Sequence, residues 1–157
     1  MTLPHADRDA DARRDIVSAR FFDAPRERVF EALCEPSLLA RWWGPNGFAN
    51  TIHELDVRPG GNWRSVLHAP DGRDFPNHSV FVEVVRPERI VFRHISDEHP
   101  YEMAIALEER DGGTRMTWRM RHETAEACAR VRPFVVPANE ENFDRLAEVL
   151  ASMRERP

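Results

Sequence analysis

The chain contains no lysine, although it has 157 residues and 22 basic side chains, all of which are arginine. A Schiff-base lysine, a pyridoxal-phosphate anchor and a phosphate-loop lysine are therefore excluded. Glycine is also scarce, with seven residues at positions 44, 47, 60, 61, 72, 112 and 113. These glycines form neither a G-x-G-x-x-G nor a G-x-S-x-G pattern, so dinucleotide binding and nucleophile-elbow hydrolysis are unsupported.

Cysteine is limited to Cys34 and Cys128, which lack the spacing of a metal site, so we interpret both as reduced thiols. The seven histidines, at positions 5, 53, 68, 78, 94, 99 and 122, show no H-x-x-x-H spacing. We therefore expect no metal and no other cofactor. The arginines are scattered among 27 acidic residues, for a net charge of −5, which argues against nucleic acid as a partner.

Residues 1–14 carry mixed charges and no apolar segment of the kind found in signal peptides or membrane anchors. We expect residues 1–13 to form a flexible leader and residues 14–154 to form a single domain, because this length suits one hydrophobic core. The expected location is the cytoplasm, with no membrane partner. The expected assembly is a monomer or a weak homodimer.

The most unusual segment is RWWGPNG, residues 41–47, in which two of the four tryptophans precede a turn. Two adjacent side chains at the end of a helix cannot point the same way. At least one of the two indoles is therefore expected to line a cavity or to close a loop over it.

Hydrophobic periodicity predicts a strand, two short helices, a run of strands and a final helical region. The first strand covers about 15–22, and Asp23, Pro25 and Glu27 mark the start of the helix after it. A second short helix covers about 37–43. The following strands are predicted at about 48–57, 62–68, 76–85, 89–95, 101–109 and 114–122. The final helical region spans about 124–153.

Within the final helical region, we expect Pro133 and Pro137 to interrupt the helix and Asn139 to cap its second half. That second half carries an apolar stripe, formed by Phe143, Leu146, Ala147, Leu150 and Met153.

This order of elements predicts an α+β fold, in which a curved antiparallel sheet of about seven strands wraps around a long C-terminal helix. In the last strand, Met116, Trp118 and Met120 alternate with polar residues, so one face of the sheet is expected to be buried. A strongly curved sheet and one helix seldom close completely. We therefore expect a cavity between them.

Five segments carry a family resemblance. They are APxxxVF from residue 24, WWGP from residue 42, DxRPGGxW from residue 56, LHAPDGxDFPN from residue 67 and PERIVF from residue 87. With them, residues 15–153 resemble the START-like, helix-grip (SRPBCC) superfamily, and within it the branch named for homologues of the heat-shock ATPase activator. The resemblance implies the helix-grip fold. It leaves the function open, because the superfamily includes ligand carriers, polyketide cyclases, self-sacrificing resistance proteins and co-chaperone domains.

Strand alternation places His53 and His94 on apolar faces, so both imidazoles are expected to point into the cavity. They are the candidate catalytic residues, because such a pair can move protons near neutral pH, although two satisfied histidines at the core edge explain the pattern more simply. The tryptophans and flexible methionines predict a pocket for a flat apolar ligand. Its expected lining is Trp42 or Trp43, Phe48, His53, Leu55, Trp63, Leu67, His94, Met103, Ile105, Met116, Trp118, Met120, Phe143 and Leu146.

The leading hypothesis is the binding of a small hydrophobic molecule between the sheet and the C-terminal helix. One alternative is an enzyme of cyclase or hydratase type that uses His53 and His94 as acid and base. It requires a pocket open to solvent and a carboxylate within hydrogen-bond reach of an imidazole. The other alternative is a co-chaperone-like protein-binding domain, which requires a filled interior and a contiguous exposed apolar patch.

Overall fold

The computed structural model describes residues 12–154, which form one antiparallel sheet with helices packed on its inner side. The strands are β1 (Asp15–Phe22), β2 (Ala49–Leu55), β3 (Asn62–His68), β4 (Asp74–Val85), β5 (Arg89–His94), β6 (Tyr101–Arg110) and β7 (Gly113–His122). The helices are α2 (Arg26–Cys34), α3 (Pro36–Trp42) and α4 (Ala125–Arg154). The seven strands lie in the order β1-β7-β6-β5-β4-β3-β2. This confirms the predicted α+β helix-grip architecture.

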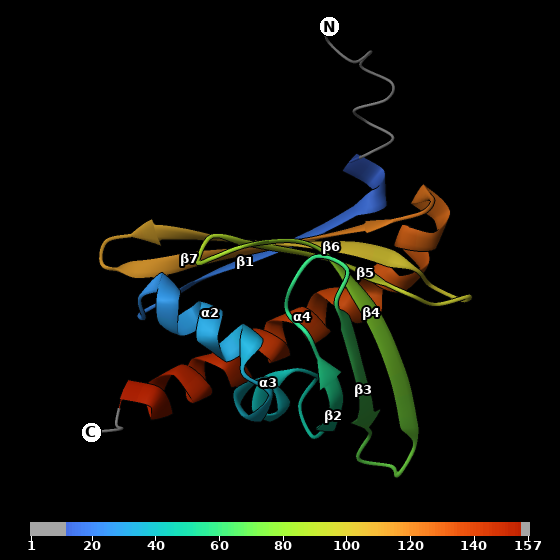
Figure 1. Cartoon of the computed structure of the whole chain (residues 1–157). Coiled ribbons are helices and arrows are strands. Elements are labelled where there is room, and N and C mark those ends of the chain that lie inside the picture. Colours follow the sequence, from blue (N-terminus) through green and yellow to red (C-terminus); the bar gives the residue numbers. More distant parts are fainter. Residues whose placement is uncertain (1–11, 155–157) are drawn as a thin grey trace, which may run out of the picture.

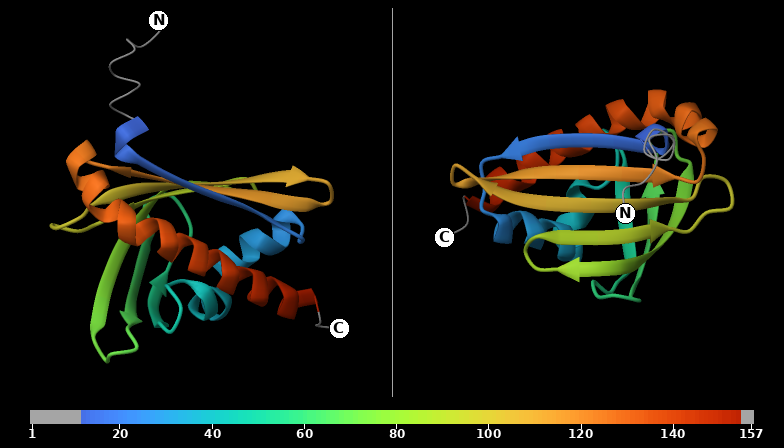
Figure 2. Two further views of the ribbon diagram at one scale, coloured as in Figure 1. Left: turned by 180° about the vertical axis from the view of Figure 1, so that it is seen from behind. Right: turned by 90° about the horizontal axis from the view of Figure 1, so that it is seen from above.

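The sheet is strongly curved, since β2, β3 and β4 turn away from the layer formed by the other strands (Figure 1). Two bulges contribute to this curvature. The pairing shifts by one residue between Ile52 and Glu54 on β2 and again between Phe81 and Glu83 on β4. A bulge bends its strand and increases the local twist. The result is a concave inner face, on whose side α2, α3 and α4 all lie (Figure 2).

Helix α4 is one continuous helix of 30 residues, so the predicted interruption at Pro133 and Pro137 is wrong. Both prolines are exposed, and they lie one turn apart on the solvent side of the helix. The carbonyl groups that they leave without a helical donor can therefore bond to water, while the apolar contacts of the opposite side hold the helix together. The helix begins instead at Thr124, whose hydroxyl oxygen accepts a hydrogen bond from the backbone N–H of Ala127 at 3.0 Å.

Asn139 consequently lies inside α4 and does not cap a helix. Its side chain is buried, and its amide nitrogen donates to the Ser18 hydroxyl at 3.2 Å and to the Met120 sulfur at 3.5 Å. A cap was predicted because asparagine is common at helix starts. The tertiary contact with β1 and β7 decides its role instead.

The core lies between the concave face and the three helices. On β7, Met116, Trp118 and Met120 are buried, whereas Arg115 and Arg119 are exposed, which confirms the predicted register. Cross-strand pairing extends this buried face into apolar rows. One such row consists of Phe81, Phe92, Met103, Met120 and Ile16, which come from β4, β5, β6, β7 and β1.

The exposed position of Pro137 leads to a stability prediction. Replacing Pro137 by Ala restores a helical N–H and removes the clash of the proline ring, which together favour Ala by about 3 kcal/mol in a helix interior. Greater freedom of the unfolded chain offsets about 1 kcal/mol of this. We expect urea unfolding at pH 7 to show a gain of about 1–2 kcal/mol for Pro137→Ala, with little change for Arg130→Ala. A loss of stability would show that the core requires the bend that Pro137 imposes on α4.

Candidate ligand site between the sheet and helix α4

All four tryptophans meet in one aromatic cluster on the concave side of the sheet. Trp43 lies at its centre, with its ring centroid 4.8 Å from that of Trp63 and 5.1 Å from that of Trp118. Its distance to the Trp42 centroid is 5.4 Å and to the Phe92 centroid 6.1 Å. Both adjacent indoles of RWWGPNG therefore pack against the aromatic cluster, in different ways.

Trp42 and Trp43 differ in burial and in hydrogen bonding. Trp42 is fully buried, and its indole N–H donates to the carbonyl oxygen of Ala32 at 3.0 Å. Trp43 is half-buried, and within the described residues its indole has no hydrogen bond. Trp42 is therefore a structural anchor of α3 against α2, whereas only packing holds the Trp43 side chain.

The backbone around Trp43 is fixed by α4. The Asn142 side-chain oxygen accepts from the N–H of Gly44 at 2.7 Å, and the Arg145 guanidinium donates to the carbonyls of Gly44, Pro45 and Arg41 at 2.7, 3.0 and 3.0 Å. Burial lowers the pKa of Arg145, and these three carbonyls solvate its charge. Gly44 has φ +123°, a conformation that favours glycine, and a β-carbon there would lie 3.1 Å from Leu67 Cδ2. The turn therefore presents Trp43 to the sheet in a single backbone conformation.

A row of polar and aromatic residues crosses the inner face near one end of the sheet. Cross-strand pairing aligns one residue from each of β3 to β7, namely Trp63, Ser79, His94, Tyr101 and His122. We refer to these five residues as the polar row. Four of them, Trp63, Ser79, His94 and His122, are buried. The polar row places hydrogen-bonding groups at one end of the inner face, where Ser65 is also buried.

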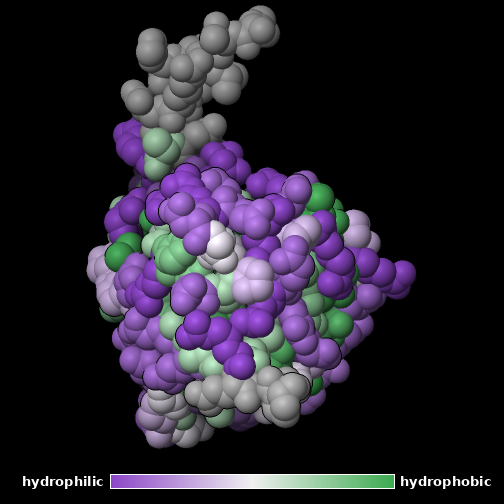
Figure 3. Space-filling model, turned by 90° about the vertical axis from the view of Figure 1, so that its left-hand side faces the viewer, coloured by the Kyte–Doolittle hydropathy of each residue, from purple (hydrophilic) through white to green (hydrophobic). Residues whose placement is uncertain are grey.

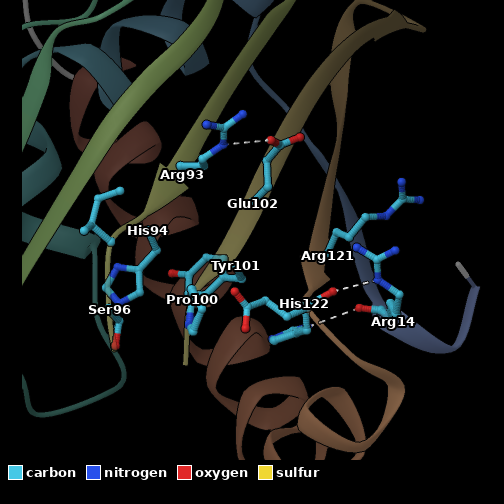
Figure 4. Close-up of a pocket in the computed structure, with 11 residues that line it drawn as sticks. Arg14, Arg93, His94, Ser96, Pro100, Tyr101, Glu102, Arg121 and His122 are labelled. Atoms are coloured by element: carbon cyan, nitrogen blue, oxygen red, sulfur yellow. Dashed lines mark hydrogen bonds and ion pairs between the residues drawn. The ribbon is translucent and has the colours of Figure 1, made fainter. Parts of the chain in front are cut away.

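The rings of the polar row stack against one another. Tyr101 lies between His94, with centroids 4.8 Å apart, and His122, with centroids 5.8 Å apart. Figure 4 shows these three side chains projecting from β5, β6 and β7, with the Arg93–Glu102 pair pointing away from them. Burial lowers the pKa of His94 to about 4, and the nearby His99 and His78 add to the shift. Burial also raises the pKa of Tyr101 to about 12. Both groups are therefore neutral at pH 7.

Among residues 12–154, two indole N–H groups are buried without a hydrogen-bond acceptor. They are those of Trp63, which is 6% exposed, and Trp118, which is 1% exposed. An unpaired buried donor costs about 1–3 kcal/mol, and tryptophans in protein cores usually have a partner for this group. The two donors therefore mark a place where a hydrogen-bond acceptor would be stabilised.

The sequence led us to expect an open cavity, but the spaces found beside Trp43 within residues 12–154 are small. One of about 20 Å³ borders Trp43, Trp63 and three members of the polar row, namely Ser79, His94 and Tyr101. One of about 10 Å³ borders Trp43, Trp63 and Phe92 on the apolar side. Each is large enough for one water molecule at most. The Trp43 indole takes up the space that was expected to be empty.

A wider groove of about 390 Å³ lies at the same end of the sheet, and His94 and Tyr101 line both this groove and the smaller polar space. The cations at the groove are already engaged. Arg93 pairs with Glu102 at 3.5 Å, and Arg14 donates to the backbone carbonyl of His122 at 2.9 Å. His94 and Tyr101 lie between this groove and the smaller polar space.

Most of the predicted lining residues face the core. Those that are buried are Trp42, Trp63, His94, Met103, Ile105, Met116, Trp118, Met120, Phe143 and Leu146. Trp43 and Leu55 are half-buried and pack against the core, while Leu67 and Phe48 are half-buried near the turn after α3. Phe48 packs against Phe75, with ring centroids 6.4 Å apart, at the edge of the structure.

The prediction that His53 points into the cavity is wrong, because its side chain is exposed. His53 is the extra residue of the β2 bulge, where Ile52 pairs with Ser65 and Glu54 already pairs with Arg64. Strict alternation assigned His53 to the face of Leu55. One inserted residue reverses that assignment for every position before the bulge.

Several interior residues were not predicted from the sequence. Tyr101 shares its strand parity with Met103, so alternation alone could have identified it. Asn139 and Asn142 precede Phe143 and Leu146 at helical spacing, so they could have been assigned to the same stripe. No local signal identifies Ser79, because the bulge at Val82 interrupts the alternation of β4.

His68 lies on the outer side of the sheet in a short hydrogen-bonded chain. Its Nε2 is 2.8 Å from the Thr51 hydroxyl, and its Nδ1 is 2.7 Å from an Asp74 carboxylate oxygen. Thr51 and Asp74 are exposed and His68 is half-buried, and none of the three lines the interior spaces or the groove described above. We interpret these hydrogen bonds as structural contacts that link β2, β3 and β4.

Neither a metal site nor a membrane span is supported by the described residues. They contain no group of three ligating side chains that could hold a metal ion. None of their helices is both long and apolar enough to cross a bilayer.

Residues 23–151 match a family model described as Activator of Hsp90 ATPase homolog 1-like protein. A solved structure of a Nitrosomonas europaea protein is 26% identical, with a TM-score of 0.84 over 91% of this chain and 97% of that one. A Mycobacterium smegmatis protein is 24% identical, with a TM-score of 0.81 over 91% and 94%. A Silicibacter pomeroyi protein is 21% identical, with a TM-score of 0.72 over 88% and 99%. No curated protein matches the sequence.

The buried, neutral state of His94 leads to a prediction about acid stability. The unfolded chain binds a proton at His94 near pH 6.5, whereas the folded protein resists it down to about pH 4. The unfolded state therefore binds more protons in this window, and stability falls as the pH falls. We expect His94 to contribute about 2 kcal/mol of this loss. This is less than the free energy that corresponds to the whole pKa shift, because water partly reaches the ring.

The measurement is urea unfolding at several values between pH 7 and pH 4. His94→Gln should give a flatter profile than the parent chain. The exposed His53→Gln serves as the matched control and should follow the parent profile. Parallel profiles for all three proteins would contradict the burial of a neutral His94.

Proposed function

The chain belongs to the Activator of Hsp90 ATPase homolog 1-like family, and from that premise we propose that it binds a small, flat and largely apolar molecule between the sheet and α4. The observation that carries the proposal is the composition of the inner face. Apolar rows cover most of it, and the polar row lies at one end. In the described part of the chain, the indole N–H groups of Trp63 and Trp118 have no acceptor.

The apolar part of this face suits an aromatic ring. Phe81, Phe92 and Trp63 form edge and stacked contacts with centroids 5.2–6.3 Å apart, which is the usual range for aromatic packing. Met103 and Met120 lie in the same row, and methionine side chains adapt their shape to a neighbour. A largely apolar surface with a few polar groups is typical of small-molecule sites.

The polar row gives the proposed ligand an orientation. Trp63 supplies an N–H donor, Ser79 a hydroxyl, and His94 an imidazole that is neutral at pH 7. An indole N–H only donates, so its complement is an acceptor such as a carbonyl or ether oxygen. The expected ligand therefore has an apolar body and an acceptor at one end.

The enzyme alternative has less support. His53 is exposed. Within the described residues, His94 contacts aromatic rings and has no carboxylate within hydrogen-bond reach. The acid and base pair that this alternative requires is therefore not assembled on the inner face.

The co-chaperone-like alternative requires a filled interior and a contiguous apolar surface. The interior is nearly filled, as that alternative expects. However, the large exposed apolar side chains are spread over β1, β4, the end of β5 and α4. They are Val17, Phe21, Phe75, Val82, Val85, Ile95, Phe134 and Val136. The face of the molecule in Figure 3 is mainly hydrophilic, with small separate apolar areas. Small-molecule binding is therefore the function that the geometry supports better.

A matched pair of probes tests the proposed function. Calorimetric titration with 2-acetylnaphthalene, which has a carbonyl, and with naphthalene should show binding of both, with the ketone preferred. Ser79→Val removes one hydroxyl of the polar row and should weaken ketone binding about threefold to tenfold while leaving naphthalene unchanged, since a neutral hydrogen bond contributes about 0.5–1.5 kcal/mol.

The control is Thr117→Val, which makes the same kind of change on β7 away from the polar row and should alter neither affinity. Native mass spectrometry of freshly purified protein should also detect a co-purifying small molecule. If neither probe binds and no small molecule co-purifies, the protein-binding alternative takes precedence.

A further inference from the structure

We infer that the ligand occupies the space now filled by the Trp43 indole, and that it is a planar, roughly bicyclic aromatic molecule with a hydrogen-bond acceptor. The inference rests on the proposed function and specifies its ligand class and its controlling residue. Trp43 is then the side chain that must move before the interior can accept a ligand.

The first argument is the position of the two interior spaces. Both border Trp43, Trp63 and Phe92, but one also contacts Ser79, His94 and Tyr101, and the other also contacts Leu33, Leu39, Phe81, Ile90 and Ile105. At about 20 and 10 Å³, neither holds more than a water molecule. Withdrawal of the Trp43 side chain would join them into one space with a polar end and an apolar end.

The second argument is that Trp43 can move while its surroundings stay in place. Its own N–H donates to the Leu39 carbonyl at 3.0 Å, and its carbonyl accepts from Asn50 at 3.3 Å. With the contacts of Asn142 and Arg145 to the next residues, these bonds fix the backbone on both sides. The indole has no such bond within the described residues and already contacts solvent. Rotation of the side chain alone is therefore sufficient, and the neighbouring Trp42 remains bonded to Ala32.

The third argument concerns the rings that surround the Trp43 indole. Trp63 and Phe92 meet it at interplanar angles of 66° and 64°, and Trp118 meets it at 40°. A planar ligand of similar size would keep these edge and tilted contacts. Trp63 and Trp118 also carry the two unpartnered indole N–H groups. An acceptor on the ligand can pair with one of them, which the hydrocarbon surface of Trp43 cannot do.

The first test follows the four indoles of the parent chain labelled with 5-fluorotryptophan. Fluorine NMR signals are assigned through single Trp→Phe variants, and solvent contact is read from the shift between H₂O and D₂O. Saturation with 1-indanone, a planar bicyclic ketone, should increase the solvent isotope shift of Trp43 and leave that of Trp42 unchanged. If 1-indanone binds and the solvent isotope shift of Trp43 does not increase, the inference that the ligand displaces Trp43 is wrong. The proposed function would still stand in that case.

The second test removes the Trp43 side chain. Trp43→Ala should bind 1-indanone at least tenfold more tightly than the parent chain, because the site no longer has to be vacated. The matched control is Phe134→Ala, which deletes an aromatic ring on α4 that is 77% exposed, and it should leave the affinity unchanged. Equal affinity of the parent chain and Trp43→Ala would overturn the inference.

The third test examines the acceptor. Indane has the same skeleton as 1-indanone but no carbonyl, so the ratio of their affinities measures hydrogen bonding in the site. Trp43→Ala should prefer 1-indanone, and adding Trp63→Phe, which keeps an aromatic ring but removes the N–H, should reduce that preference at least threefold. An unchanged preference would show that Trp63 is not the donor. If neither compound binds to the parent chain or to Trp43→Ala, the proposed function fails together with this inference.

Discussion

The attachment of the turn after α3 to helix α4 is the interaction on which the interior depends. Arg145 donates to three carbonyls of residues 41–45, and Asn142 accepts from Gly44. A cation that bonds the free carbonyls at the end of a helix is favourable, and here it also joins two elements about 100 residues apart in sequence. Because the turn is held in this way, Trp43 is directed toward the concave face. The filling of the core therefore depends on polar contacts at its edge.

Two adjacent tryptophans serve different purposes because their indoles meet different surroundings. Trp42 is enclosed by α2, α3 and the sheet, and its N–H is bonded to a carbonyl. Trp43 packs against four aromatic rings, but it is only half-buried, and within the described residues its indole is held by packing alone. The Trp42 side chain is thus fixed by a hydrogen bond, whereas a ligand could displace the Trp43 side chain. Because of that difference, a filled core can still be a candidate binding site.

In the polar row, strand pairing brings hydrogen-bonding side chains together at one end of a mainly apolar surface. Each strand from β3 to β7 contributes a single residue, and pairing brings the five into line. The low pKa of His94 and the high pKa of Tyr101 share one cause, since burial disfavours the charged form of each. The row is therefore a set of neutral hydrogen-bonding groups at pH 7. Such a set suits the recognition of a neutral polar atom better than proton transfer.

Local sequence patterns are enough to predict the helices and strands, their order and the face that each regular strand buries. Alternation in β7 identified Met116, Trp118 and Met120 as interior, and the stripe of α4 identified Phe143 and Leu146. Period-two and helical spacing are properties of local backbone geometry, so a sequence can display them directly. The features that break these periods depend on the tertiary structure. The β2 bulge places the His53 side chain on the opposite face from the one predicted. Packing against β1 and β7 keeps α4 continuous across Pro133 and Pro137. The occupation of the interior by Trp43 follows from contacts between residues distant in the chain, which no local pattern records.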